Sequence, residues 1–150
     1  MIIREAKISD IAEIRKLGAN VYEFSTTEEV VTFWPEHILR NCVESKTDWL
    51  LVAEKDSEII GFIICNNSRV FKKAVIENVF VSPLHRKKGV GKKLLESLLA
   101  KIQLTDCEYV AVATGDNNNT AISFYVKNGF NRGGNFAWMD KVLSEKFSKL

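Results

Sequence analysis

The chain has little of what metal centres and disulfide frameworks are built from. It has three widely spaced cysteines, Cys42, Cys65 and Cys107, with no CxxC pair, and only two histidines, His37 and His85. An odd cysteine count without paired spacing argues against a disulfide framework and against a zinc site. We therefore expect no metal, and thiols that pack as small hydrophobic groups.

Long apolar runs and a bias of charge are missing as well. No stretch approaches the ~18 consecutive apolar residues of a membrane span. Arg4 and Glu5 stand where a signal peptide needs an apolar segment. With 21 basic and 19 acidic residues, the formal net charge of +2 is too even to indicate a nucleic acid or a membrane as partner. We expect a soluble, cytoplasmic protein.

The length and composition predict one globular domain over residues 1–150. Hydrophobic residues make up 46% and charged residues 27% of the chain, close to the averages of folded proteins, which excludes a disordered chain. No repeat and no linker composition marks a boundary within it.

Hydrophobic periodicity predicts helices interleaved with strands, and hence an α/β or α+β domain with a largely antiparallel sheet. We expect strands near residues 2–8, 49–54, 58–65, 74–81 and 108–114, and a final hairpin between residues 130 and 143. We expect helices over 10–22, from 26 to about 33, from Pro35 to about 43, over 90–102 and over 120–127.

The most informative segment is the basic loop after the strand that ends at Val81. Two glycines, Gly89 and Gly91, precede a helix directly, and Arg86, Lys87, Lys88, Lys92 and Lys93 surround them. Free N–H groups in the first helical turn, together with its partial positive charge, favour a bound phosphate or pyrophosphate. The loop is neither a Walker motif nor GxGxxG. The alternative is a solvated basic turn with glycines for packing.

This loop resembles the signature of the GNAT superfamily of acetyl-CoA-dependent N-acetyltransferases. Residues 86–91, Arg-Lys-Lys-Gly-Val-Gly, match its Arg/Gln-x-x-Gly-x-Gly/Ala pattern completely. Residues 3–10, 58–62 and 118–130 are similar to its first strand with helix cap, its third strand, and its Asn-x-x-Ala-x-x-x-Tyr-x-x-x-Gly-Phe segment. The four matches occur in the family's order and cover nearly the whole chain.

The resemblance implies an acyl-CoA N-acyltransferase-like fold: a mixed, mostly antiparallel, twisted sheet flanked by helices and splayed between strands 74–81 and 108–114, where acetyl-CoA binds. A bulge in strand 74–81 would aim an N–H at the thioester carbonyl. Asn118 would lie near the pantetheine, and Tyr125 would protonate the departing thiolate. The cofactor-binding residues it implies are Val79, Phe80, Val81, Arg86, Lys87, Lys88, Gly89, Val90, Gly91, Lys92 and Asn118.

Glu77 is the candidate base, because an ammonium must lose a proton before it attacks a thioester and a strand carboxylate can accept it. Alternatively, Glu77 faces solvent or pairs across the sheet with a lysine or arginine. Tyr125 could instead be a core aromatic. In relatives, the segment with Phe33, Trp34 and His37 walls the acceptor pocket, although core packing explains these residues nearly as well.

These features predict an enzyme that transfers acetyl from acetyl-CoA to a primary amine by direct attack in a ternary complex. The amine is a small molecule or a peptide, and a homodimer is possible because many relatives form one. The alternative is a non-catalytic CoA-binding sensor or partner subunit, which the absence of any acceptor signature favours.

Overall fold

The computed structural model describes residues 1–19, 21, 33–135 and 137–144. One sheet has the strand order β1-β2-β3-β4-β5; β1 to β4 are antiparallel neighbours, and β5 runs parallel to β4. The strands are β1 (Ile2–Glu5), β2 (Trp49–Lys55), β3 (Glu58–Ser68), β4 (Lys73–Val81) and β5 (Tyr109–Val112). The helices are α1 (Ile11–Gly18), α2 (Glu36–Glu44), α3 (Val90–Gln103) and α4 (Asn119–Lys127), with short 3-10 turns at Ile8–Asp10 and Pro83–His85.

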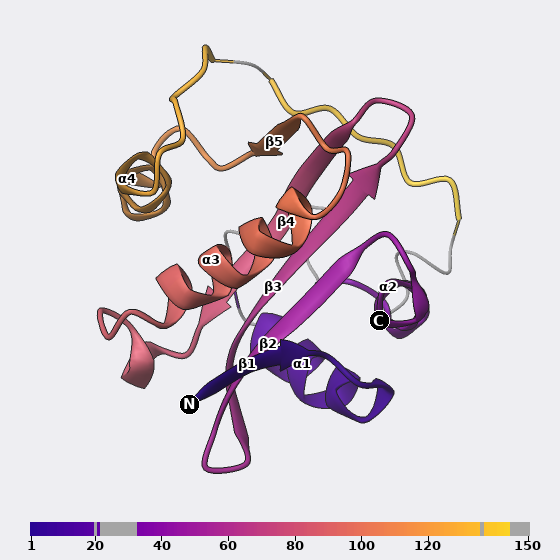
Figure 1. Cartoon of the computed structure of the whole chain (residues 1–150), viewed down its shortest axis with the longest axis vertical. Coiled ribbons are helices and arrows are strands. Elements are labelled where there is room, and N and C mark those ends of the chain that lie inside the picture. Colours follow the sequence, from indigo (N-terminus) through magenta and orange to yellow (C-terminus); the bar gives the residue numbers. More distant parts are fainter. Residues whose placement is uncertain (20, 22–32, 136, 145–150) are drawn as a thin grey trace.

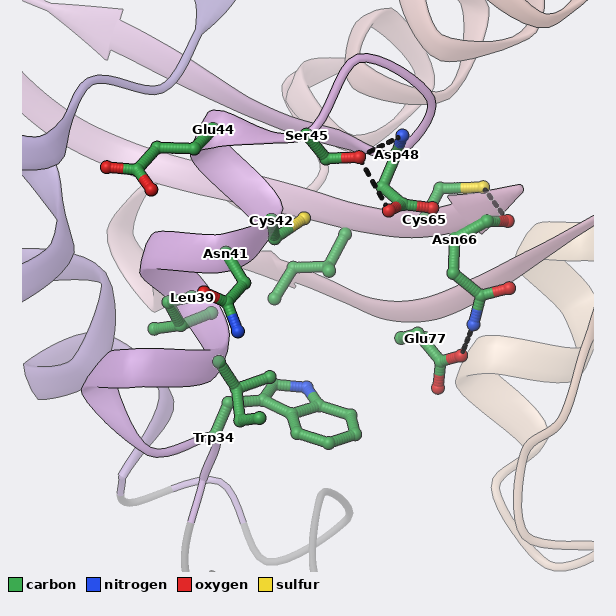
Figure 2. A pocket seen from close by; sticks show the side chains of 12 residues that line it. Trp34, Leu39, Asn41, Cys42, Glu44, Ser45, Asp48, Cys65, Asn66 and Glu77 are labelled. Atoms are coloured by element: carbon green, nitrogen blue, oxygen red, sulfur yellow. Dashed lines mark hydrogen bonds between the residues drawn. The ribbon is translucent and has the colours of Figure 1, made fainter. Parts of the chain in front are cut away.

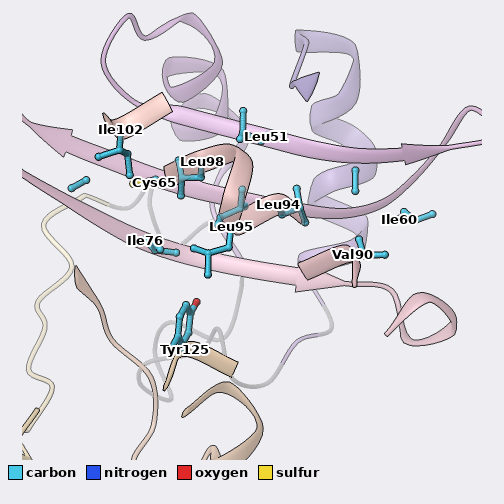
Figure 3. Packing of buried hydrophobic residues seen from close by; sticks show 13 residues of the cluster. Leu51, Ile60, Cys65, Ile76, Val90, Leu94, Leu95, Leu98, Ile102 and Tyr125 are labelled. Atoms are coloured by element: carbon cyan, nitrogen blue, oxygen red, sulfur yellow. The ribbon is translucent and has the colours of Figure 1, made fainter. Parts of the chain in front are cut away.

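The sheet is buried on both faces, which explains why β2 and β3 are almost continuously apolar. Because side chains alternate along a strand, Leu51 and Ala53 pack on the α3 face, while Leu50 and Val52 pack on the α1 and α2 face. Figure 3 shows the first cluster, in which α3 lies across β3 and β4. The predicted mixed, mostly antiparallel sheet flanked by helices is confirmed (Figure 1).

The predicted C-terminal hairpin is wrong. Residues 130–135 and 137–144 contain no strand, and the side chains of Trp138, Met139 and Leu143 are 59%, 88% and 87% exposed. A strand needs a neighbour that accepts its hydrogen bonds and a face that becomes buried, and neither is readable from a local alternating pattern. The helix expected from residue 26 to about 33 lies, except for Phe33, outside the described residues.

The last pair of strands is splayed as expected. Contact between β4 and β5 covers only residues 73–76 of β4, paired with 109–112. In the described part of the chain, residues 77–81 of β4 have no strand on that side, and α4 stands off from them beyond β5 (Figure 1). The sheet therefore opens along the second half of β4, between α3 and α4.

Arg4 anchors the first strand to its neighbours. Its guanidinium donates to both carboxylate oxygens of Asp10, at 2.7 and 3.1 Å, and to Glu54 Oε2 at 2.6 Å. Asp10 also accepts the N–H of Lys7 at 2.7 Å. The hydrogen bond from Arg4 holds the pKa of Asp10 below its usual value, although burial opposes this. The network thus ties β1 to β2 and to the start of α1.

Replacing Arg4 by methionine should lower the free energy of unfolding at neutral pH by about 1–3 kcal/mol, because the buried Asp10 loses its charged partner. A carboxyl whose folded pKa is lowered stabilises the protein above its unfolded pKa of about 3.9, and this stabilisation is lost as pH falls through the folded pKa. The difference from wild type in urea unfolding should therefore shrink on acidification. Lys16→Met, which removes an exposed partner of Glu13, is the control; a difference independent of pH would contradict the assignment.

Candidate active site

A β-bulge in β4 organises the site. In the β3–β4 ladder Ile64 pairs with Asn78 and Cys65 pairs with Ile76, so Glu77 is an extra residue. Such a residue interrupts the alternation of side chains. Glu77 and Asn78 consequently both point to the α2 face, where Asn66 donates to Glu77 Oε1 and Trp34 Nε1 donates to Asn78 Oδ1 at 2.6 Å. The bulge expected in this strand is present, and it lies at the candidate base.

The bulge opens onto a cavity of about 460 Å³ between α2 and the sheet (Figure 2). Its apolar wall is formed by one face of α2 and by the residues of β3 that face this helix. The lining residues are Trp34, Ile38, Leu39, Asn41, Cys42, Glu44, Ser45, Asp48, Ile64, Cys65, Asn66 and Glu77. Pockets of this size, with apolar walls and few polar groups, are typical of small-ligand sites.

Of the three residues expected to wall an acceptor pocket, the structure places one there. Trp34 lines the cavity, held by its hydrogen bond to Asn78. Phe33 is buried in the core, with its ring 5.4 Å from that of Phe62, and His37 is exposed and is not part of the lining. Core packing is therefore the correct interpretation for Phe33.

The environment of Glu77 suits a proton acceptor. Its side chain is partly buried, and burial raises the pKa of its carboxyl above the ordinary value. Among the described residues, no lysine or arginine lies within ion-pair distance of it, which rules out the cross-strand ion pair within that part of the chain. A carboxylate with a raised pKa accepts a proton more readily than an exposed one.

On the other side of β4, the basic loop has the geometry of an anion cradle. Lys87 and Gly89 both have positive φ, 59° and 79°, and Gly89 is the N-cap of α3 without any side chain to satisfy the first helical N–H groups. A Cβ at Gly89 would meet no atom within 4 Å, so the space above it is open. His85 adds a buried ring nitrogen, Nδ1, without a hydrogen-bond partner. These residues fit a phosphate group.

Several predicted cofactor residues have side chains committed elsewhere. Val90 is buried in the α3 cluster, and Phe80 is buried on the α2 side. Arg86 Nε donates to the carbonyl of Val81 at 2.9 Å, which folds the loop back on the end of β4, while Lys92 pairs with Glu96 at 3.6 Å. For Phe80 and Val90, whose side chains are buried, only backbone groups are available to a ligand, whereas the side chains of Val79 and Val81 are half-buried.

Tyr125 lies on α4 and packs in the same cluster as Val79 and Val81 of the unpaired half of β4, and Asn118 is the N-cap of α4. The ring of Tyr125 is buried, with edge contacts to Phe124 and Phe130, and its hydroxyl points toward β4 (Figure 3). Burial raises the pKa of this hydroxyl, so it stays protonated. Asn118 Oδ1 accepts the N–H of Ala121 at 3.1 Å and thereby caps α4, a structural role that the sequence motif alone does not reveal.

Gly91 lies where α4 and the end of β4 closely approach the first turn of α3. A Cβ there would lie 3.5 Å from the ring of Phe124 and 3.6 Å from Val81, so α4 rests directly on the first turn of α3. Alanine fits in ordinary contact, whereas a larger side chain would push α4 away. This packing explains why the signature accepts glycine or alanine at this position.

Asn66 and Asp48 are site residues that sequence reasoning missed. Both lie on the α2 face because they continue the alternation that starts at Phe62 and Ile64 in β3 and at Leu50 and Val52 in β2. That period-two pattern could have placed them on one face. The meeting of Asn66 with Glu77, however, depends on the bulge.

Neither metal ligation nor a membrane span is indicated in the part of the chain that the structure describes. No three His, Cys, Asp or Glu side chains gather there around a possible metal ion. None of the helices in these residues is long and apolar enough to cross a bilayer.

Asn66→Ala should raise the pKa of Glu77 further, because the amide of Asn66 stabilises the charged carboxylate. The carboxyl carbon of Glu77, titrated by NMR and assigned by its loss in Glu77→Gln, reports this pKa directly. Asn67→Ala is the matched control, since its side chain points to the opposite face of β3 and its Oδ1 has no partner. An unchanged titration in Asn66→Ala would show that the hydrogen bond does not hold the carboxylate.

Known proteins are similar to this chain in sequence and in structure. The acetyltransferase (GNAT) family matches residues 14–130. An uncharacterized N-acetyltransferase of Bacillus subtilis, YhfO, is 31% identical over 134 residues, covering 87% of this chain and 89% of that protein. A spermidine N(1)-acetyltransferase of Thermoplasma acidophilum is 26% identical, covering 85% and 86% of the two chains.

Solved structures agree on the fold. A PaiA N-acetyltransferase from Thermoplasma acidophilum, in complex with coenzyme A, superposes with a TM-score of 0.76 at 23% identity, covering 87% of this chain and 89% of that one. A protein of Bacillus halodurans, BH1408, superposes with a TM-score of 0.77 at 18% identity, covering 95% of this chain and all of that one. With the family match over most of the sequence, these similarities establish that the chain belongs to the GNAT family of N-acetyltransferases.

Proposed function

We propose that this protein transfers an acetyl group from acetyl-CoA to a primary amine by direct attack in a ternary complex. The observation that carries the proposal is the position of β4 between two openings. The cavity with Glu77 lies on the α2 side, and the cradle and Tyr125 lie where β4 separates from β5. Donor and acceptor would thus reach the bulge from opposite sides.

On the donor side, the first N–H groups of α3, with Lys87 and Lys88, would hold the pyrophosphate. Lys92 would join them by giving up its exposed ion pair with Glu96. The free edge of β4 at residues 79–81 would hydrogen-bond the pantetheine arm. Because the bulge interrupts the ladder at Glu77, a backbone N–H there would donate to the thioester carbonyl and stabilise the charge that develops on its oxygen. Acetyl-CoA supplies the activated acyl group.

On the acceptor side, Glu77 would take the proton of the bound ammonium, directly or through a water, so that the amine nitrogen attacks the thioester carbon. Collapse of the tetrahedral adduct breaks the C–S bond, and the adduct nitrogen loses its excess proton to water as the amide forms. Tyr125 would donate its hydroxyl proton to the leaving sulfur, since its raised pKa keeps that proton available. The products are an N-acetylated amine and CoA.

Binding of acetyl-CoA tests the cradle. Gly89→Ala should lower the free energy of unfolding by about 1–2 kcal/mol, because an L-residue is strained at positive φ, yet keep affinity because the space above is open. Gly89→Glu carries the same backbone strain plus a negative charge, and should abolish binding in isothermal titration. Wild-type protein that binds neither acetyl-CoA nor CoA at millimolar concentration would refute the proposal.

Turnover tests the catalytic assignment. With a primary amine that the wild type acetylates, Tyr125→Phe should reduce the rate of CoA release by ~10²–10⁴-fold, the usual contribution of a positioned general acid. Packing and acetyl-CoA affinity should persist, because only a hydroxyl is lost. Tyr109→Phe, on the exposed surface of β5, is the control. Turnover unchanged within about twofold would make Tyr125 a packing residue.

The same assay separates the enzyme from a CoA-binding sensor. A sensor would bind CoA and acetylate none of a panel of polyamines, amino acids, aminoglycosides and peptide N-termini. The absence of an acceptor motif in the sequence favours this second candidate, whereas the partly buried carboxylate of Glu77 in a cavity favours the enzyme.

A further inference from the structure

The acceptor cavity holds more negative charge than one ammonium ion compensates. Asp48, which directly precedes β2, is partly buried like Glu77, and both line the cavity. Within the described residues neither has a lysine, arginine or histidine within ion-pair distance. Carboxylates that are withdrawn from water without a counter-ion are costly, so their presence in an apolar-walled cavity calls for a cationic ligand.

The carboxylate of Asp48 is held in a fixed orientation. Ser45 Oγ donates to its Oδ2 at 2.7 Å, and the N–H of Asn67 donates to its Oδ1 at 2.8 Å. These neutral donors orient the group without neutralising it, and each oxygen retains a further acceptor position. The result is a pre-oriented anion at the cavity wall.

The negative charges of Asp48 and Glu77 both affect groups that line the same cavity. Burial is the main cause that raises the pKa of the Cys42 and Cys65 thiols to about 12, and repulsion by both carboxylates adds to it. In Figure 2, Asp48 and Glu77 lie on the same side of the cavity, across from α2, with Asn66 between them, and Trp34 lies on the Glu77 side. Glu44 is also part of the lining, but it is exposed and its carboxylate is turned away from the other two.

We propose that the acceptor is a primary amine carrying a second ammonium group a few carbons away, and that Asp48 is the residue that selects it. The inference rests on the proposed function, in which Glu77 receives the reacting amine. The methylene chain between the two nitrogens would lie against the apolar wall of Ile38, Leu39 and Ile64. A monoamine leaves Asp48 uncompensated, whereas a diamine compensates both carboxylates.

Three amines of equal chain length separate charge from size: putrescine, n-butylamine, which lacks the second amine, and γ-aminobutyrate, which has a carboxylate in its place. Titrated calorimetrically into the protein saturated with CoA, putrescine should bind ~10–100-fold more tightly than butylamine, the usual contribution of a charge-assisted hydrogen bond. γ-Aminobutyrate should bind most weakly. In the acetylation assay the same order should appear in kcat/KM, mainly through KM.

Asp48→Asn should bring the ratio of putrescine affinity to butylamine affinity close to one. A purely structural effect would weaken both amines equally, so the ratio between them reports selection. Glu58→Gln, which removes one exposed carboxylate outside the cavity, matches the change in net charge and should leave the ratio unaltered.

Equal binding of putrescine and butylamine by the wild type, or an unchanged ratio in Asp48→Asn, would overturn the inference even if both amines are acetylated. Tight, Asp48-dependent binding of putrescine without turnover would instead uphold the inference and overturn the proposed catalysis. The two measurements therefore distinguish a failure of the inference from a failure of the proposed catalysis.

Discussion

The extra residue in β4 is the constraint on which the rest of the site depends. Regular antiparallel pairing would send Glu77 and Asn78 to opposite faces of the sheet, one of them into the α3 cluster. The bulge keeps both on the α2 face, where Asn78 fixes the indole of Trp34 and Glu77 meets Asn66. A single extra residue in the ladder therefore places both Trp34, through Asn78, and the carboxylate of Glu77 at the cavity.

The surrounding core makes this irregularity tolerable. Strands β2 and β3 are buried on both faces. Helix α3 covers one of these faces with five buried apolar side chains. Such a core holds β4 in register up to the bulge and beyond it. The pairing of β4 with β5 can then stop after Ile76, because β4 is still secured by β3 along its whole length. The sheet thus opens at its edge without losing the pairing at its centre.

Charge is divided between the two sides of β4. The loop before α3 presents lysines, a helix N-terminus and backbone at positive φ, all of which favour anions. The cavity beneath α2 presents Asp48 and Glu77 without cationic partners among the described residues. The proposed polyanionic donor and cationic acceptor would therefore be favoured on different sides of β4. Burial of Glu77 and Tyr125 between these sides keeps their pKa values raised.

Local pattern determined much of this protein. The fold and the family could be predicted from the helical spacing of Val90, Leu94 and Leu98, the apolar runs of β2 and β3, and the loop from Arg86 to Gly91. Each of these features is a property of consecutive residues. Tertiary structure alone decided the rest. It made Asn118 a helix cap and Phe33 a core residue, and it left residues 137–144 without a strand partner. It also brought Asp48, which precedes β2, to the same cavity as Asn66 of β3 and Glu77 of β4. Such contacts depend on register and on a bulge, and a one-residue change in register moves every side chain of a strand to the other face.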